Sequence, residues 1–184
     1  EFADLKVIRF RVPGWDNLSL RQKEYAYHLS EAAKLGRDIT WDQYCKWNLP
    51  IRHVVEDILN EYEGDRECAD FQNFTVYAKR LFFANGIHHH YSEDKFVPEC
   101  PKEYFQSLME AVGDGEQATE LLEVIYSPDI YPQRRSTSKT GDIVELSAVN
   151  FYDGVTREEV DKYYNSMMDP NDKTPISYGL NTKV

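Results

Sequence analysis

Long apolar runs are missing from this chain of 184 residues, and its three cysteines form no closely spaced pair. No apolar stretch approaches the roughly 18–20 residues that a membrane-spanning helix needs, so we expect no membrane span. Cys45, Cys68 and Cys100 are too few and too widely spaced for a disulfide framework or a structural zinc site. The scattered thiols slightly favour a cytoplasmic location, and a periplasmic one stays open.

Catalytic motifs and positive charge are also scarce. The sequence contains no GxSxG nucleophile turn, no glycine-rich phosphate loop, no HExxH zinc helix and no His-Glu pair. Lys and Arg number 21 against 32 Asp and Glu, which gives a net charge of −11 at neutral pH. Because such a chain repels phosphate backbones and anionic lipid, we expect neither nucleic acid nor a membrane surface as a partner.

The sequence does contain a series of amphipathic helical patterns. Apolar residues make up 41% of the chain and aromatic residues 14%, which is enough to build a hydrophobic core. Capping boxes predict helix starts at Ser19 with Gln22, Thr40 with Gln43, and Thr156 with Glu159. Apolar residues at helical spacing predict further helices over residues 50–62, about 67–85, and around 105–112 and 118–125.

Two segments nearer the C-terminus predict strands instead. Apolar and polar residues alternate over 144–148, which is typical of a half-buried strand. A second strand-like pattern begins at residue 176 and stops at Val184, and such a strand has unpaired backbone groups on at least one side unless it lies at the edge of a sheet. The predicted fold class is α+β: predominantly helical, with a small, incomplete antiparallel sheet near the C-terminus. Because the linkers are short, residues 1–184 should form a single unit.

One loop, residues 85–98, has the unusual sequence NGIHHHYSEDKFVP. In an extended segment His88 and His90 would point to the same side, as two zinc ligands do. Glu93 or Asp94 would then be the third ligand. A second interpretation is a polar loop whose imidazoles only bond to neighbouring groups. A third is a glycine-hinged loop that lines a ligand-binding cleft. Two ligands with no second motif elsewhere make a weak metal site, so the sequence favours the ligand-binding loop.

Three segments look like the signature of one family: GRDITWDQ (residues 36–43), FFANGIHHHYSEDKFVPE (82–99) and ELSAVNFYDGVTREEVDKYY (145–164). Together they resemble the N-terminal part of the dipeptidyl peptidase III family, and its bacterial members most of all. The order of the flanking elements also matches. The resemblance covers nearly all of the chain.

Members of this family are two-lobed zinc exopeptidases, much longer than this chain, that release dipeptides from the N-termini of short peptides. The resemblance implies that residues 1–184 are the N-terminal part of the lower, substrate-binding lobe. It puts the zinc on a HExxxH-type or HExxH-type helix of the other lobe, so no cofactor is expected here. The implied partners are a peptide substrate and the missing zinc-bearing lobe of the same chain. We expect the segment to be inactive alone.

The resemblance carries two residues over to this chain and no catalytic one. Tyr91 and His90 match family positions that line the pocket for the first side chains of the substrate. A phenol offers a flat apolar wall and one hydroxyl, which suits such a pocket. Tyr91 could instead only pack its own loop down. The alternative function is a stand-alone binding or scaffold domain that uses residues 88–91 for a metal or a protein partner.

Overall fold

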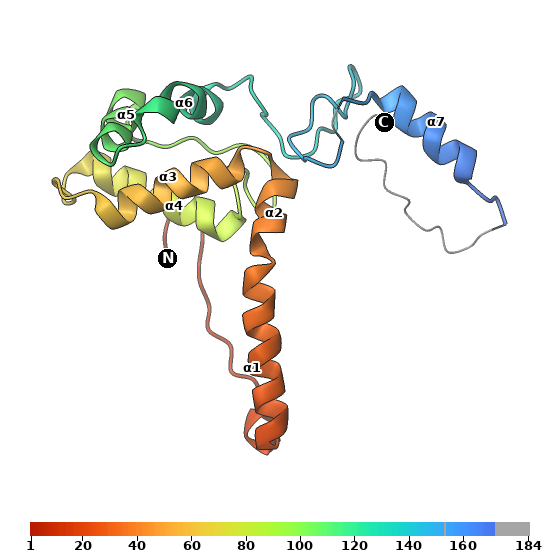
Figure 1. The fold of residues 1–184 in the computed structure, drawn as a ribbon, viewed down its shortest axis with the longest axis horizontal. Coiled ribbons are helices and arrows are strands. Elements are labelled where there is room, and N and C mark those ends of the chain that lie inside the picture. The colour runs from red at the N-terminus through yellow and green to blue at the C-terminus, as the bar shows by residue number, and fades with distance from the viewer. Residues whose placement is uncertain (153, 172–184) are drawn as a thin grey trace.

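The computed structural model describes residues 1–152 and 154–171. Within them the elements are, in chain order, η1 (Trp15–Asn17), α1 (Leu20–Leu35), α2 (Arg37–Tyr44), α3 (Asn48–Glu61), α4 (Ala69–Ala84), α5 (Lys102–Ala111), η2 (Gly115–Gln117), α6 (Ala118–Tyr126) and α7 (Arg157–Met167). Figure 1 shows α3 to α6 gathered in one cluster. α1 extends away from this cluster, and α7 follows at the far end of a long connection.

The core lies between the apolar faces of α3, α4, α5 and α6. α3 buries residues spaced i, i+3, i+4 and i+7, namely Ile51, Val54, Val55 and Ile58. α4 buries Phe71, Phe74, Tyr77, Ala78, Leu81 and Ala84. α5 packs on α3 and α6, and its Phe105 ring lies edge-on to Phe74 with 5.1 Å between centroids. The helices predicted from apolar spacing over residues 50–62, 67–85, 105–112 and 118–125 are therefore confirmed.

The predicted helix starts are confirmed at two of three positions. Ser19 and Thr156 each accept the backbone N–H of the residue three positions later, and both capping boxes are complete. The box predicted at Thr40 is wrong, because α2 begins three residues earlier at Arg37 and Thr40 lies inside it. α2 starts directly after Gly36, which ends α1.

α1 stands apart from the core (Figure 1). It buries none of its residues, and Tyr25 and Leu29 on its apolar face are exposed. α7 likewise buries only Val160 among its residues. The longest described helices, α1 and α4, have 16 residues each, and no helix in the described ranges is long and apolar enough to cross a membrane.

The predicted antiparallel sheet is wrong for the residues that the structure describes. Residues 143–146 form a turn and residues 147–148 are irregular, with no strand, because nearby side chains bind the backbone in competition with a ladder. Asp142 Oδ1 accepts the Val144 N–H at 2.8 Å, and Ser147 Oγ donates to the carbonyl four residues earlier at 2.6 Å. The edge strand predicted at 176–184 lies outside the described residues. The described fold is therefore predominantly helical rather than α+β, and its only antiparallel pairing is in isolated bridges.

Candidate functional site

The histidine loop, residues 85–98, is a closed turn held by backbone hydrogen bonds along both of its arms. Within the loop, the Phe96 N–H donates to the Ile87 carbonyl at 3.1 Å and the His89 N–H to the Asp94 carbonyl at 2.8 Å. Toward the neighbouring segment, the Lys95 N–H donates to the Pro132 carbonyl at 2.9 Å. The Glu93 carbonyl accepts the Arg134 N–H at 2.9 Å. Isolated antiparallel bridges join His88 to Lys95 and Asp94 to Gln133. The loop is thus fixed against the chain around residues 132–134.

Asn48 anchors the start of the loop. Its fully buried amide donates from Nδ2 to the Trp41 carbonyl at 3.0 Å and accepts the Ile87 N–H at 3.1 Å. Gly86 lies directly against this amide at a φ of +150°, and a Cβ there would lie 2.3 Å from Asn48 Nδ2. Only glycine permits this approach, so one buried amide joins α2, α3 and the loop.

Lys95 fastens the second arm of the loop to the end of α6. Its Nζ donates to the carbonyls of Val124 at 3.0 Å, Ile130 at 2.7 Å and Ser127. The last carbonyls of a helix lack partners and carry the negative end of its dipole, so a lysine satisfies them well. Burial lowers the pKa of Lys95.

Glu93 accepts hydrogen bonds from two arginines. Arg134 Nη2 lies 2.6 Å from Oε1, and Arg135 donates to Oε1 and, from Nε at 2.9 Å, to Oε2. The side chains of Glu93 and Arg134 are only 15% and 10% exposed. The hydrogen bonds from Arg135 and Arg134 outweigh burial and lower the pKa of Glu93 to about 2. This ion-pair cluster ties the loop to residues 134–135.

The polar segment of residues 133–141 includes one buried side chain. Arg134 is 8% exposed, and its guanidinium lies 4.3 Å from the centre of the Tyr44 ring. Sequence reasoning missed this residue, as it missed Lys95 and Asn48, and it considered Glu93 only as a metal ligand. The one available signal was that Glu93 and the arginines some 40 positions later in the chain carry opposite charges.

His88 is buried, although polar loops are normally exposed. Its Nε2–H donates to the Tyr131 carbonyl at 2.9 Å, and Nδ1 has no hydrogen-bond partner among the described residues. His90, the other candidate zinc ligand, is exposed. In the part of the chain that the structure describes, no group of three or more His, Cys, Asp or Glu side chains could hold a metal ion. The geometry therefore lends the metal hypothesis no support.

His89 shapes the tip of the loop. Its Nδ1 accepts the N–H groups of Tyr91 at 3.2 Å and Ser92 at 3.0 Å, so the proton of the neutral ring lies on Nε2. Nε2 lies 3.0 Å from the Asp4 carboxylate. The middle histidine of the run is thus a structural residue that holds the backbone of the turn.

Tyr91 and His90, the predicted substrate-binding residues, both lie at the exposed tip. The Tyr91 side chain is 87% exposed and forms no ring contact with another described residue. The His90 ring lies edge-on to Phe83 at 4.9 Å and near His89 at 4.4 Å between centroids. Because the Tyr91 ring is left exposed by the residues that the structure describes, it does not pack the loop against them.

The first of the three segments that resemble dipeptidyl peptidase III contacts both of the others. Arg37 of α2 donates from Nη2 to Asn85 Oδ1 at 3.1 Å, at the point where the histidine loop begins. At the other end of α2, the Gln43 carbonyl accepts the Asn150 N–H at 2.8 Å. Hydrogen bonds therefore join α2 to both of the other segments.

Comparison with known proteins assigns no family to this chain. No protein-family model matches it, and no curated protein sequence is significantly similar to it. The resemblance seen in the three segments therefore stays a prediction. The same holds for the zinc, the peptidase activity and the peptide partner that it implies.

We expect His88 to make the fold less stable in mild acid. Burial lowers the pKa of His88 from 6.5 to about 4. Below about pH 6.5 the unfolded chain takes up this proton and the folded chain does not, so the free energy of unfolding falls between about pH 6.5 and 4, by up to about 3 kcal/mol. Urea unfolding across this range should show that the free energy of unfolding decreases less for His88→Gln than for the unchanged chain. The glutamine amide can still donate to the Tyr131 carbonyl.

The matched control for this measurement is His53→Gln, because His53 is an exposed histidine on α3. This variant should keep the full decrease in stability. An equal decrease in His88→Gln and in the unchanged chain would contradict the assignment to His88.

Proposed function

We propose that this chain contributes the substrate-binding lobe of a zinc-dependent dipeptidyl peptidase. The residues of the three family-like segments suggest this function, and the hydrogen bonds that join α2 to both other segments support it. The observation that carries the proposal is Tyr91, a large aromatic side chain that is 87% exposed on a firmly held turn. Binding residues are commonly found on loops that a scaffold fixes in place, and aromatic side chains are frequent among them.

The loop suits contact with a peptide because its support does not depend on Tyr91 or His90. Hydrogen bonds of Asn48, Lys95 and Glu93 fix the loop at three points. The phenol of Tyr91 is then free to place its flat face against varied side chains and to bond a peptide group with its hydroxyl. The net charge of −11 is compatible with attraction of the cationic N-terminus of a peptide.

Zinc has no ligand set among the residues described, so the proposal puts it in polypeptide outside this segment. When bound, zinc would polarise the scissile carbonyl and activate water. The part of this chain is limited to binding and orienting the peptide through Tyr91 and His90.

The test uses the native gene product that contains this segment. We expect it to release dipeptides from a dipeptidyl chromogenic amide and to lose this activity when a zinc chelator is added. Residues 1–184 alone should release none, even with added zinc. In the native protein, Tyr91→Ala should raise KM about tenfold with a smaller effect on kcat, since it removes binding shared by ground and transition states. Tyr91→Phe should retain most of the affinity.

The control variant is Tyr27→Ala, which removes another exposed tyrosine from α1. It should leave both kinetic constants unchanged. The proposal fails if the native gene ends at Val184, or if its product releases no dipeptide in a chelator-sensitive way. Tight, stoichiometric zinc binding by this chain, lost in a His88→Ala/His90→Ala double variant, would favour the stand-alone binding domain instead.

A further inference from the structure

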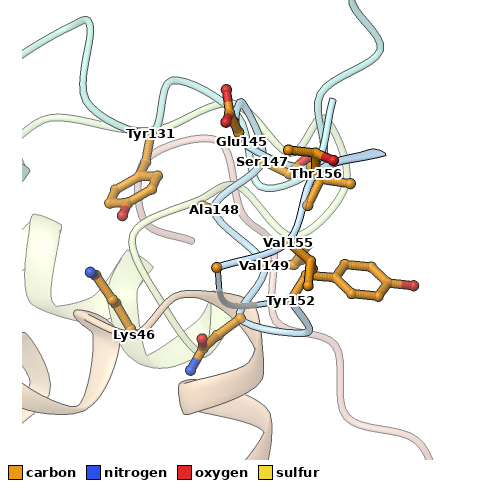
Figure 2. Close-up of a pocket in the computed structure, with 12 residues that line it drawn as sticks. Lys46, Tyr131, Glu145, Ser147, Ala148, Val149, Tyr152, Val155 and Thr156 are labelled. Carbon is orange, nitrogen blue, oxygen red and sulfur yellow. The ribbon is translucent and has the colours of Figure 1, made fainter. Parts of the chain in front are cut away.

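A pocket of about 410 Å³ lies between Lys46, which follows α2, and the turns that precede α7 (Figure 2). Its lining includes Tyr131, Ala148, Val149 and Val155. Pockets of this size hold small organic molecules or a residue or two of peptide. Neither His90 nor Tyr91 belongs to the lining, so the pocket is separate from the tip of the histidine loop.

Two polar groups converge on one side of this pocket. Figure 2 shows the amine of Lys46 and the hydroxyl of Tyr131 pointing toward one another. Neither group forms a hydrogen bond or an ion pair within the described residues, and Lys46 makes only a cation–π contact with Trp47 at 5.4 Å. Glu145, the other charged side chain of the lining, lies away from Lys46. The pair therefore offers free donors and one positive charge.

The backbone of Tyr131 is held in an uncommon conformation. Its φ is +49°, in the left-handed region that residues other than glycine rarely adopt, and Pro132 follows it. Its carbonyl accepts the His88 Nε2–H at 2.9 Å, which keeps this residue in place. Strained residues that their surroundings fix are found mainly at functional sites, where they orient a side chain in advance.

The rest of the lining includes apolar side chains beside the polar residues Ser147, Asn150 and Thr156. Ala148 and Val155 are buried, and Val149 is half-buried. The N–H groups of Ala148 and Val149 donate to the carbonyls of Gln133 and Arg134 at 3.3 and 3.1 Å, so this part of the lining is fixed to the same segment that supports the histidine loop. The pocket thus joins a cationic, hydrogen-bonding end to a side that carries several apolar side chains.

We propose that this pocket binds a carboxylate that carries a small apolar group. The two carboxylate oxygens accept hydrogen bonds from Lys46 and Tyr131, and the apolar group packs on Ala148, Val149 and Val155. One ammonium and one hydroxyl match a singly charged anion with two oxygens better than a doubly charged phosphate. A free carboxylic acid and the C-terminal residue of a peptide share this chemistry.

The test is an NMR titration of the chain with N-acetyl-leucine and with N-acetyl-leucinamide, which differ in the carboxylate alone. We expect the acid to shift the amide resonances of Val149 and Val155 in a saturable way, with a Kd of about 1–10 mM, and the amide to bind at least about tenfold more weakly. Lys46→Met should weaken binding of the acid at least about tenfold, and Tyr131→Phe by about threefold. Lys139→Met, an exposed lysine outside the lining, is the matched control and should change nothing.

The two sources of carboxylate are distinguished by N-acetyl-Ala-Ala-Leu. Tighter binding of this peptide than of N-acetyl-leucine assigns the pocket to peptide C-termini, and equal binding assigns it to small acids. The proposal is overturned by equal binding of acid and amide, by full binding in Lys46→Met, or by no saturable shift up to about 50 mM ligand. Because the assay measures no hydrolysis and does not involve Tyr91, its failure would leave the proposed function untouched.

Discussion

Glu93→Gln is expected to lower the free energy of unfolding at neutral pH by about 3 kcal/mol. The change keeps the size of the side chain but removes the charge that pairs with Arg134 and Arg135. Arg134 is 10% exposed on its side chain, so its guanidinium would stay buried without an anion. Removing one partner of a buried ion pair typically costs about 3–5 kcal/mol, and the lower end applies because the glutamine oxygen still accepts a hydrogen bond.

Acid should act on the same cluster. The pKa of Glu93 is lowered from 4.5 to about 2, so its stabilising effect is complete above about pH 4.5 and is lost as the pH falls toward 2. Between neutral pH and about pH 3, the free energy of unfolding measured with urea should therefore decrease less for Glu93→Gln than for the unchanged chain. Glu99→Gln, at an exposed position directly after the histidine loop, is the control and should behave like the unchanged chain. A Glu93→Gln chain that is as stable as the unchanged one at neutral pH would contradict the role given to the cluster.

The helical core could be predicted from the sequence because its signal is local. The spacing of Ile51, Val55 and Ile58 within α3 is set by the helix period alone, whatever packs against it. The strand expected at 144–148 failed for a local reason too. Alternation of apolar and polar residues is a weak signal over five positions, and the backbone contacts of Asp142 and Ser147 override it.

The support of the histidine loop could not be predicted because it depends on pairs far apart in the chain. Glu93 and Arg134 are 41 positions apart, and Asn48 and Ile87 are 39 apart. No periodic pattern links such positions. The expectation that His88 and His90 share one side also required an extended segment, whereas the backbone turns back on itself, with Glu93 at a φ of +67°. His88 is therefore buried while His90 is exposed.

Gly86→Ala adds one methyl group and should destabilise this region more than any other such addition. We expect it to lower the free energy of unfolding by about 4 kcal/mol. Two effects combine. A φ of +150° is a conformation that alanine adopts only under strain, and the new Cβ would lie 2.3 Å from Asn48 Nδ2. The Asn48 amide would have to move, which would break its hydrogen bonds to the Trp41 carbonyl and the Ile87 N–H.

Gly113→Ala separates these two effects. Gly113 has a φ of +92°, and a Cβ there meets no atom within 4 Å, so this variant reports backbone strain alone, of about 1–2 kcal/mol. The remaining cost at Gly86 is assigned to Asn48 and can be measured in a double-mutant cycle with Asn48→Ala. If displacement of the amide is the cause, the double variant should be more stable than the sum of the single changes indicates, by about 1–3 kcal/mol. Strict additivity, or equal costs at Gly86 and Gly113, would mean that the buried amide does not join α2, α3 and the loop as described.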